Sequence, residues 1–181
     1  MEEELRTGGR IPHQPLESLP YVDPGGSLVD EQTHVLRREA ESTPYRSDYQ
    51  IYDTDDQLSV IGQVMGELNI DPKRNRPRTI LGAISNAKNE LISPREFAAP
   101  NYFGEIVARV YRGYQEQLIA NNAMDFDDLL MQTVVLLRDN EVVREKYQKF
   151  YEYVLVDEFQ DTNIAQYKLV QLFGAPQNNI F

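Results

Sequence analysis

Residues 153–162 decide the fold and read Tyr-Val-Leu-Val-Asp-Glu-Phe-Gln-Asp-Thr. Their first four residues are apolar or aromatic and favour β-structure, which predicts a strand buried on both faces of a parallel sheet. The strand ends at the acid pair Asp157-Glu158. Ligands of open α/β sheets bind beyond the carboxyl ends of the strands. The stretch therefore predicts a piece of α/β sheet with a ligand site at its end.

The acid pair has residue types that suit phosphate chemistry. Asp157 is a candidate ligand for Mg²⁺, which prefers carboxylate oxygens. Glu158 points to the opposite side of the strand and is a candidate to orient or deprotonate an attacking water. Gln160 carries both a donor and an acceptor, which suits a sensor of phosphate or of a nearby loop. Strand ends also often carry solvated acids, and on local sequence alone this alternative stays open.

Helical patterns dominate the chain outside this stretch. Apolar spacing and capping residues predict helices over residues 35–41, 54–68, 78–91, 102–120, 126–138, 141–150 and 163–173. Residues 49–52 and 180–181 are predicted to be short extended pieces, and Gly174 is predicted to end the last helix in the left-handed conformation. In the helix that starts at Phe126, Asp125, Asp127 and Asp128 are interpreted as capping and first-turn residues. The predicted fold class is α/β, predominantly helical, with an incomplete parallel sheet.

Composition excludes several classes of protein. The chain has 181 residues, a formal net charge of −11, no cysteine and two histidines. Disulfide scaffolds, thiolate metal sites and cysteine nucleophiles are therefore excluded. An acidic start without an apolar segment predicts no signal peptide, and no apolar run is long enough for a membrane span. A cytoplasmic protein that makes no membrane contact is expected.

Two regions differ from the rest in charge. Residues 1–34 are rich in proline and glycine and carry a net charge of −5, so they are predicted to be disordered or loosely attached, with a partner-binding tail as the alternative. Residues 73–97 carry a net charge of +4 within an acidic chain, which can hold phosphates. The candidate DNA-binding residues there are Lys73, Arg74, Arg76, Arg78 and Lys88. A solvated helix start is the alternative interpretation of this basic region.

Four segments, in this order along the chain, resemble a known family. They are Ile-Tyr-Asp-Thr-Asp-Asp-Gln at 51–57, Ile-Ser-Asn-Ala-Lys-Asn-Glu-Leu-Ile-Ser-Pro at 84–94, Met-Asp-Phe-Asp-Asp-Leu-Leu at 124–130, and Asp-Glu-Phe-Gln-Asp-Thr-Asn at 157–163. Together they resemble the UvrD/PcrA/Rep-type superfamily 1 ATP-dependent DNA helicases, motors that move 3′ to 5′ along single strands. The last segment is similar to the family's Walker B segment. The resemblance covers about residues 36–181.

The resemblance implies a division of the chain and a role for each site residue. Residues 35–52 would be a linker helix and a short extended piece, 53–124 a helical 1B-like subdomain that contacts DNA, and 125–181 part of a RecA-like (P-loop NTPase) 1A subdomain. Asp157 would support the Mg²⁺ of Mg-ATP, and Glu158 would bind the nucleotide and activate water. Gln160 would couple the nucleotide site to DNA. Single-stranded or junction DNA would be a weakly held partner.

The sequence also departs from the family pattern. No Gly-x-x-x-x-Gly-Lys-Ser/Thr loop occurs, so the backbone cradle and the lysine that would hold the triphosphate are not found in these 181 residues. The family's Thr-Phe-His segment and the segments of the second motor domain are not found either. An internal helicase fragment is therefore expected, one that binds no nucleotide tightly, does not hydrolyse ATP, and associates with the remainder of the motor or with itself through its incomplete sheet.

Two other functions stay open on the sequence. A metal-dependent nuclease or hydrolase could use Asp157 and Glu158 together with Asp161, although Asp161 also fits the start of the last helix. A non-catalytic DNA- or protein-binding module is the third reading.

Overall fold

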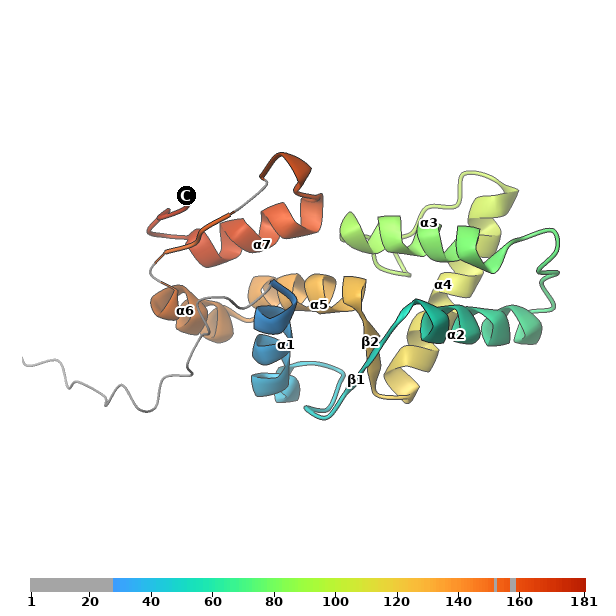
Figure 1. Cartoon of the computed structure of the whole chain (residues 1–181), viewed down its shortest axis with the longest axis horizontal. Coiled ribbons are helices and arrows are strands. Elements are labelled where there is room, and N and C mark those ends of the chain that lie inside the picture. Colours follow the sequence, from blue (N-terminus) through green and yellow to red (C-terminus); the bar gives the residue numbers. More distant parts are fainter. Residues whose placement is uncertain (1–27, 152, 157–158) are drawn as a thin grey trace, which may run out of the picture.

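The computed structural model describes residues 28–151, 153–156 and 159–181, and it is mostly helical (Figure 1). The helices are α1 (Leu28–Arg38), α2 (Thr54–Glu67), α3 (Pro77–Asn89), α4 (Tyr102–Ala120), α5 (Phe126–Asp139), α6 (Glu141–Phe150) and α7 (Ile164–Gly174). Short 3₁₀ turns, η2 and η3, cover Ala40–Ser42 and Phe159–Asp161. The strands β1 (Gln50–Tyr52) and β2 (Ala123–Asp125) form a two-stranded parallel sheet. The predicted α/β, predominantly helical class is confirmed.

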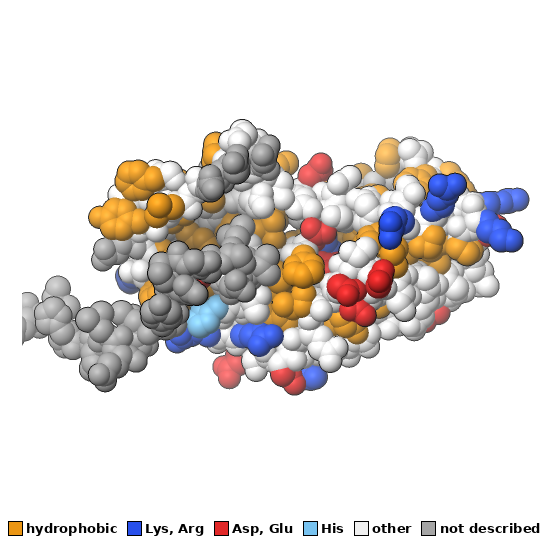
Figure 2. All heavy atoms as spheres, viewed as in Figure 1, with side chains coloured by type: hydrophobic (Ala, Val, Ile, Leu, Met, Phe, Trp, Pro, Cys, Tyr) orange, Lys and Arg blue, Asp and Glu red, His pale blue; other side chains and the backbone are white. Residues whose placement is uncertain are grey.

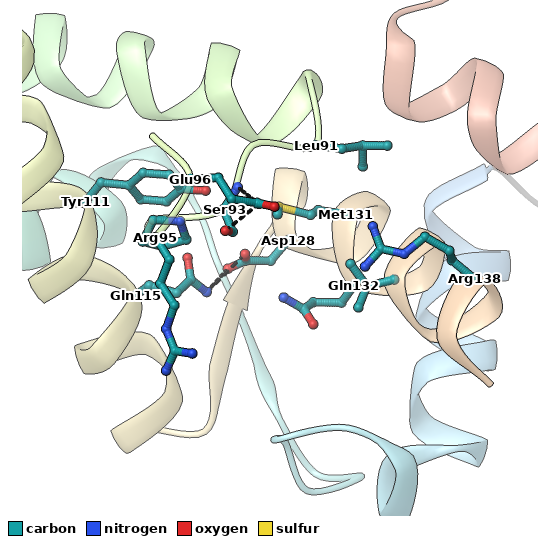
Figure 3. Close-up of a pocket in the computed structure, with 12 residues that line it drawn as sticks. Leu91, Ser93, Arg95, Glu96, Tyr111, Gln115, Asp128, Met131, Gln132 and Arg138 are labelled. Carbon is teal, nitrogen blue, oxygen red and sulfur yellow. Dashed lines mark hydrogen bonds between the residues drawn. The ribbon is translucent and has the colours of Figure 1, made fainter. Parts of the chain in front are cut away.

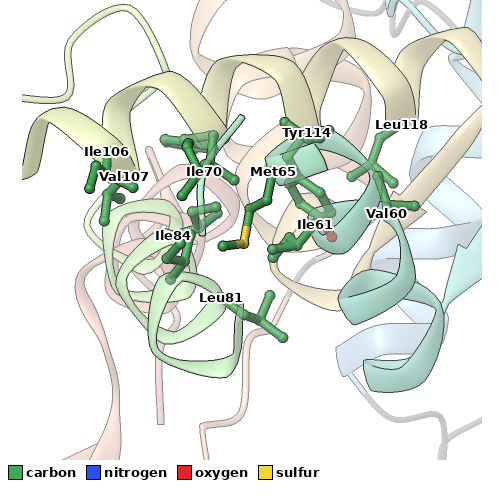
Figure 4. Close-up of a cluster of buried hydrophobic side chains, with 14 of the residues drawn as sticks. Val60, Ile61, Met65, Ile70, Leu81, Ile84, Ile106, Val107, Tyr114 and Leu118 are labelled. Carbon is green, nitrogen blue, oxygen red and sulfur yellow. The ribbon is translucent and has the colours of Figure 1, made fainter. Parts of the chain in front are cut away.

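Two clusters of buried apolar side chains hold the helices together. The first joins α2, α3 and α4, with Ile61, Met65, Ile84 and Tyr114 among its members (Figure 4). The second joins α1, α5, α6 and α7. Apolar residues recur at helical spacing on each of these helices, so one stripe of each faces a cluster. The domain boundaries expected at residues 52/53 and 124/125 stay a prediction.

The small sheet lies between the two clusters (Figure 1). Gln50 pairs with Ala123, Ile51 with Met124, and Tyr52 with Asp125. Successive residues of a strand point to opposite faces. Accordingly, Ala123 belongs to the first cluster and Met124 to the second. The sequence predicted β1 as a brief extended piece, whereas β2 was not predicted because residues 121–125 showed only helix-stop and helix-cap signals.

Residues 153–156 were predicted to be a strand of the type that is buried on both faces, in a sheet too incomplete to cover it, and the exposure of these residues agrees with the incomplete sheet. Within the described residues, Val154 forms one parallel bridge to Ile180, and Leu155 and Tyr153 are 81% and 60% exposed. A central strand needs a neighbour on each side and a layer over each face. The described part of the chain supplies one short neighbour, so these side chains stay in solvent. The expected self-association through this surface stays a prediction.

The predicted start of the first helix and the predicted conformation of Gly174 need correction. Helix α1 begins at Leu28, not at Val35, and the Tyr49 hydroxyl donates a hydrogen bond to the Thr33 carbonyl, so residues 28–34 belong to the folded part. Residues 1–27, the rest of the tail expected to be disordered, lie outside the described residues. Gly174 is the last residue of α7 and is not left-handed; a Cβ there would lie 2.6 Å from the Ile180 Cδ1. Close packing against Ile180 is therefore the reason for a glycine at this position.

None of the described helices combines the length and apolar character needed to cross a bilayer.

Candidate nucleic-acid interface

The loop before α3 presents the basic side chains that the sequence singled out. Lys73, Arg74, Arg76 and Arg78 are all exposed, at the end of the molecule where α2 turns into α3 (Figures 1 and 2). Asp71 lies 3.9 Å from Arg74, in an exposed pair of little energetic weight. These four residues are called the basic loop below.

The start of α3 adds to the positive potential of the basic loop. Arg76 is its N-cap residue, Pro77 its first helical residue, and no side chain caps the helix. Proline suits this position because its fixed φ is already helical. The helix dipole places partial positive charge at this end, next to two arginines. The geometry therefore concentrates positive charge at one end of an acidic protein.

Lys88 does not lie on this surface, which corrects its assignment to the DNA-binding residues. Its side chain is fully buried, and its Nζ lies 2.7 Å from Asp125 Oδ2 and 2.8 Å from Asp128 Oδ1. An ammonium held by two carboxylates inside the protein cannot reach a phosphate on the surface. The sequence did carry a signal of this burial, because Lys88 lies on the same face of α3 as Leu81 and Ile84. A lysine on a buried face needs an acidic partner.

The two carboxylates that hold Lys88 belong to the start of α5. Asp125 is the N-cap and accepts a hydrogen bond from the Asp128 amide at 2.7 Å, with a reciprocal bond that completes a capping box. The capping interpretation is thus confirmed for these two residues. The Tyr114 hydroxyl also donates to Asp125 Oδ2 at 2.8 Å. The Gln115 side-chain amide donates to both oxygens of Asp128. Each buried carboxylate therefore has Lys88 and at least one further hydrogen-bond donor beside it.

Burial and like charge shift the pKa values in this group. Burial, and then the neighbouring Asp125, raise the pKa of Asp128 to about 6, although Lys88 opposes the change. Burial alone would lower the pKa of Lys88, but Asp128 and Asp125 outweigh it and hold that pKa above its ordinary value. Lys88 compensates only one of the two negative charges, so the repulsion between Asp125 and Asp128 still raises the pKa of Asp128.

The Asp128 carboxyl is expected to make stability depend on pH. Its pKa is raised from 3.8 to about 6 in the folded chain, so the stability it contributes is complete below pH 3.8 and is lost as the pH rises through about 6. The difference in unfolding free energy between the wild type and Asp128→Asn should fall by about 2 kcal/mol from pH 4 to pH 7. Urea titrations at several pH values measure this difference. The exposed first-turn variant Asp55→Asn is the matched control, and a difference that does not change with pH would contradict the assignment.

Beside this buried group lies a cavity of about 390 Å³, between the loop after α3 and helices α4 and α5 (Figure 3). Asp128 and Gln115 line it from α5 and α4, and Arg95 and Arg138 line it from the loop and from α5. Glu96 also lines it and accepts a hydrogen bond from the Ser93 hydroxyl at 2.6 Å. The charged lining residues have both signs, so the cavity does not select for phosphate. None of the predicted site residues that the structure describes lines it.

Of the remaining predicted site residues, Gln160 alone lies within the described part of the chain. Asp157 and Glu158, the predicted metal- and nucleotide-binding residues, lie outside the described residues. Gln160 is exposed within η3, which precedes α7. Within the described ranges, no three carboxylates or histidines are grouped to hold a metal ion. The structure therefore does not bring Gln160 and the basic loop together in one site.

A polar junction connects α3, α5 and α7. The side-chain amide of Asn163 donates to Asn89 Oδ1 at 2.6 Å, and that of Asn89 donates to Asp127 Oδ1 at 3.0 Å. Asn163 is the N-cap of α7, and its own Oδ1 accepts from the Gln166 amide at 2.8 Å. Sequence reasoning missed this junction, because single asparagines give no signal of their long-range partners.

Comparison with known proteins identifies the class of protein. The family model of the UvrD/REP helicase N-terminal domain matches residues 32–181. The ATP-dependent DNA helicase PcrA is 48% identical over 148 residues in Bacillus subtilis (strain 168), 46% in Staphylococcus aureus (strain Mu50 / ATCC 700699) and 43% in Leuconostoc citreum. Each match covers 81% of this chain and 20% of the relative, so the chain spans about a fifth of the length of these helicases.

The chain belongs to the UvrD/REP helicase N-terminal domain family. The resemblance seen in the sequence is thereby confirmed. Intact ATP-dependent helicases use ATP, with Mg²⁺ as its usual counter-ion. Asp157 and Glu158, which the resemblance assigns to Mg-ATP, lie outside the described residues, and the 181 residues contain no Gly-x-x-x-x-Gly-Lys-Ser/Thr loop.

Proposed function

We propose that this chain is the DNA-contacting and Walker B part of an ATP-dependent DNA helicase that moves 3′ to 5′. The observation that carries the proposal is the basic loop, four exposed cations at one end of α3 in a chain of net charge −11. Phosphate contacts of this kind position a protein on DNA without reading its sequence. The family membership and the PcrA relatives, which are ATP-dependent DNA helicases, support the same function.

The proposal assigns different tasks to two regions of the chain, the basic loop and residues 157–160. The basic loop would hold the phosphates of single-stranded or junction DNA. Asp157 would support Mg²⁺, Glu158 would activate the attacking water, and Gln160 would respond to the nucleotide. The test is a titration of a fluorescent single-stranded oligonucleotide, which should bind weakly, and more weakly as salt is raised.

The 181-residue chain is expected not to turn over ATP. Its sequence supplies no Gly-x-x-x-x-Gly-Lys-Ser/Thr loop to hold the triphosphate, so an acid pair alone cannot place the nucleotide for attack. Phosphate release by the pure protein, with Mg²⁺ and single-stranded DNA present, measures this. Turnover that disappears in Glu158→Gln would contradict the expectation. DNA cleavage that needs Mg²⁺ but no nucleotide would favour a nuclease instead.

A further inference from the structure

The polar junction lies between the two regions to which the proposed function assigns a task, the basic loop and the segment that contains Gln160. Asn89 is the last residue of α3, the helix whose first turn carries the basic loop's Arg78. Asn163 is the N-cap residue of α7, and one residue, Thr162, separates it from the η3 segment that contains Gln160. From its first residue to its last, α3 is about 18 Å long at 1.5 Å per residue. One rigid helix therefore connects the basic loop to the start of α7.

The hydrogen bonds of the junction have a fixed direction. The Asn163 Oδ1 accepts from the Gln166 amide, which leaves its Nδ2 to donate to Asn89 Oδ1. The Asn89 Nδ2 then donates to Asp127 Oδ1 and to the Ser85 carbonyl. Turning either asparagine amide over would bring two acceptors or two donors together. The orientation of each side chain therefore depends on its neighbour in the junction.

Local capping does not explain the contact between Asn89 and Asn163. The α7 cap is complete within residues 163–166, since Gln166 also accepts from the Asn163 amide. Helix α3 has its own C-terminal bonds, from the Leu91 amide to Lys88 and from the Ile92 amide to Ala87. The bond between the two asparagines stabilises neither helix end locally, and its effect is to hold one helix against the other.

We propose that Asn89 is a positioning residue that couples DNA contact at the basic loop to the segment Phe159–Asn163. The inference rests on the proposed function, because it requires that DNA bind at the basic loop. A shift of α3 along or about its axis changes the distance between Asn89 and Asn163. Because one residue, Thr162, separates η3 from Asn163, the response reaches Gln160.

The test is an NMR titration of isotope-labelled full chain with a thymidine oligonucleotide. In the wild type, amide signals should shift both at the basic loop and at residues 159–163. In Asn89→Asp, the basic-loop shifts should remain while the shifts at 159–163 are lost, because the like charge of Asp127 repels the aspartate and moves its side chain away from Asn163. In Asn89→Asp with Asp127→Asn, the donor and acceptor are exchanged, and the shifts at 159–163 should return. Asn86→Ala, exposed on the same helix, is the matched control.

Two results would overturn the inference. One is a full response of residues 159–163 in Asn89→Asp. The other is a wild type whose basic loop responds to DNA while 159–163 do not. No shift at the basic loop would refute the proposed function instead. The contact on which the coupling depends is also tested without DNA: Asn163→Ala should speed hydrogen exchange in the last turn of α3, and unchanged exchange there would overturn the inference.

Discussion

Replacing Lys88 with methionine is expected to lower the free energy of unfolding by about 3–5 kcal/mol, the usual cost of removing one partner from a buried ion pair. Methionine fills a similar volume, so the loss is electrostatic rather than a cavity effect. It leaves Asp125 and Asp128 buried together without a cation. Urea denaturation at pH 7 measures the change, with Lys73→Met in the exposed basic loop as the matched control.

A triple variant separates the loss of charge balance from the loss of packing. Lys88→Met combined with Asp125→Asn and Asp128→Asn removes all three charges, and asparagine still caps helices well. Replacing a whole buried ionic group by neutral residues is often close to neutral in stability. The triple variant should therefore regain most of the stability lost in the single variant. Equal instability of the two would show that uncompensated charge is not the cause.

Replacing the basic loop's four cations with alanine is expected to remove most of the salt dependence of DNA binding. Four phosphate contacts on a single strand give a slope of about −2.8 in log affinity against log salt, or a roughly fifty-fold loss between 50 and 200 mM. In the variant this dependence should nearly disappear, together with most of the affinity at low salt. Fluorescence anisotropy at four salt concentrations measures both quantities.

The control for this experiment removes the same charge elsewhere. Arg37, Arg38, Arg46 and Lys149 are exposed and lie outside the basic loop. Their replacement by alanine lowers the net charge by the same amount, so a general electrostatic effect would appear in both variants. An unchanged slope in the basic-loop variant, or an equal loss in the control, would show that DNA binds elsewhere.

The helices could be predicted from sequence because their signals are local. Asn101 caps α4, Asp53 caps α2 and Asp125 caps α5, each before an apolar stripe. The strand at 153–156 could not be judged this way, because its burial depends on neighbouring strands. The apolar run indicated that these residues favour a buried strand. The described chain supplies one short neighbouring strand segment, so the residues stay exposed.

The same distinction applies to the candidate site. The cations of the basic loop were singled out by local charge density alone. The burial of Lys88 depends on Asp125, which lies 37 residues further along the chain. The contact between Asn89 and Asn163 spans 74 residues. Such pairs give no periodic pattern, so spacing alone cannot reveal them.

The parallel pairing of β1 with β2 has a consequence for movement. Everything from Asp53 to Asn122 is the crossover between these two strands, so the backbone passes from one apolar cluster to the other only at this narrow stem. A swing of α2–α4 would bend the stem like a hinge. The ion pairs from Lys88 on α3 to Asp125 and Asp128 at the start of α5 lie beside this stem and would restrain such a movement. Loss of these ion pairs should therefore widen the range of angles between the two apolar clusters before either cluster unfolds.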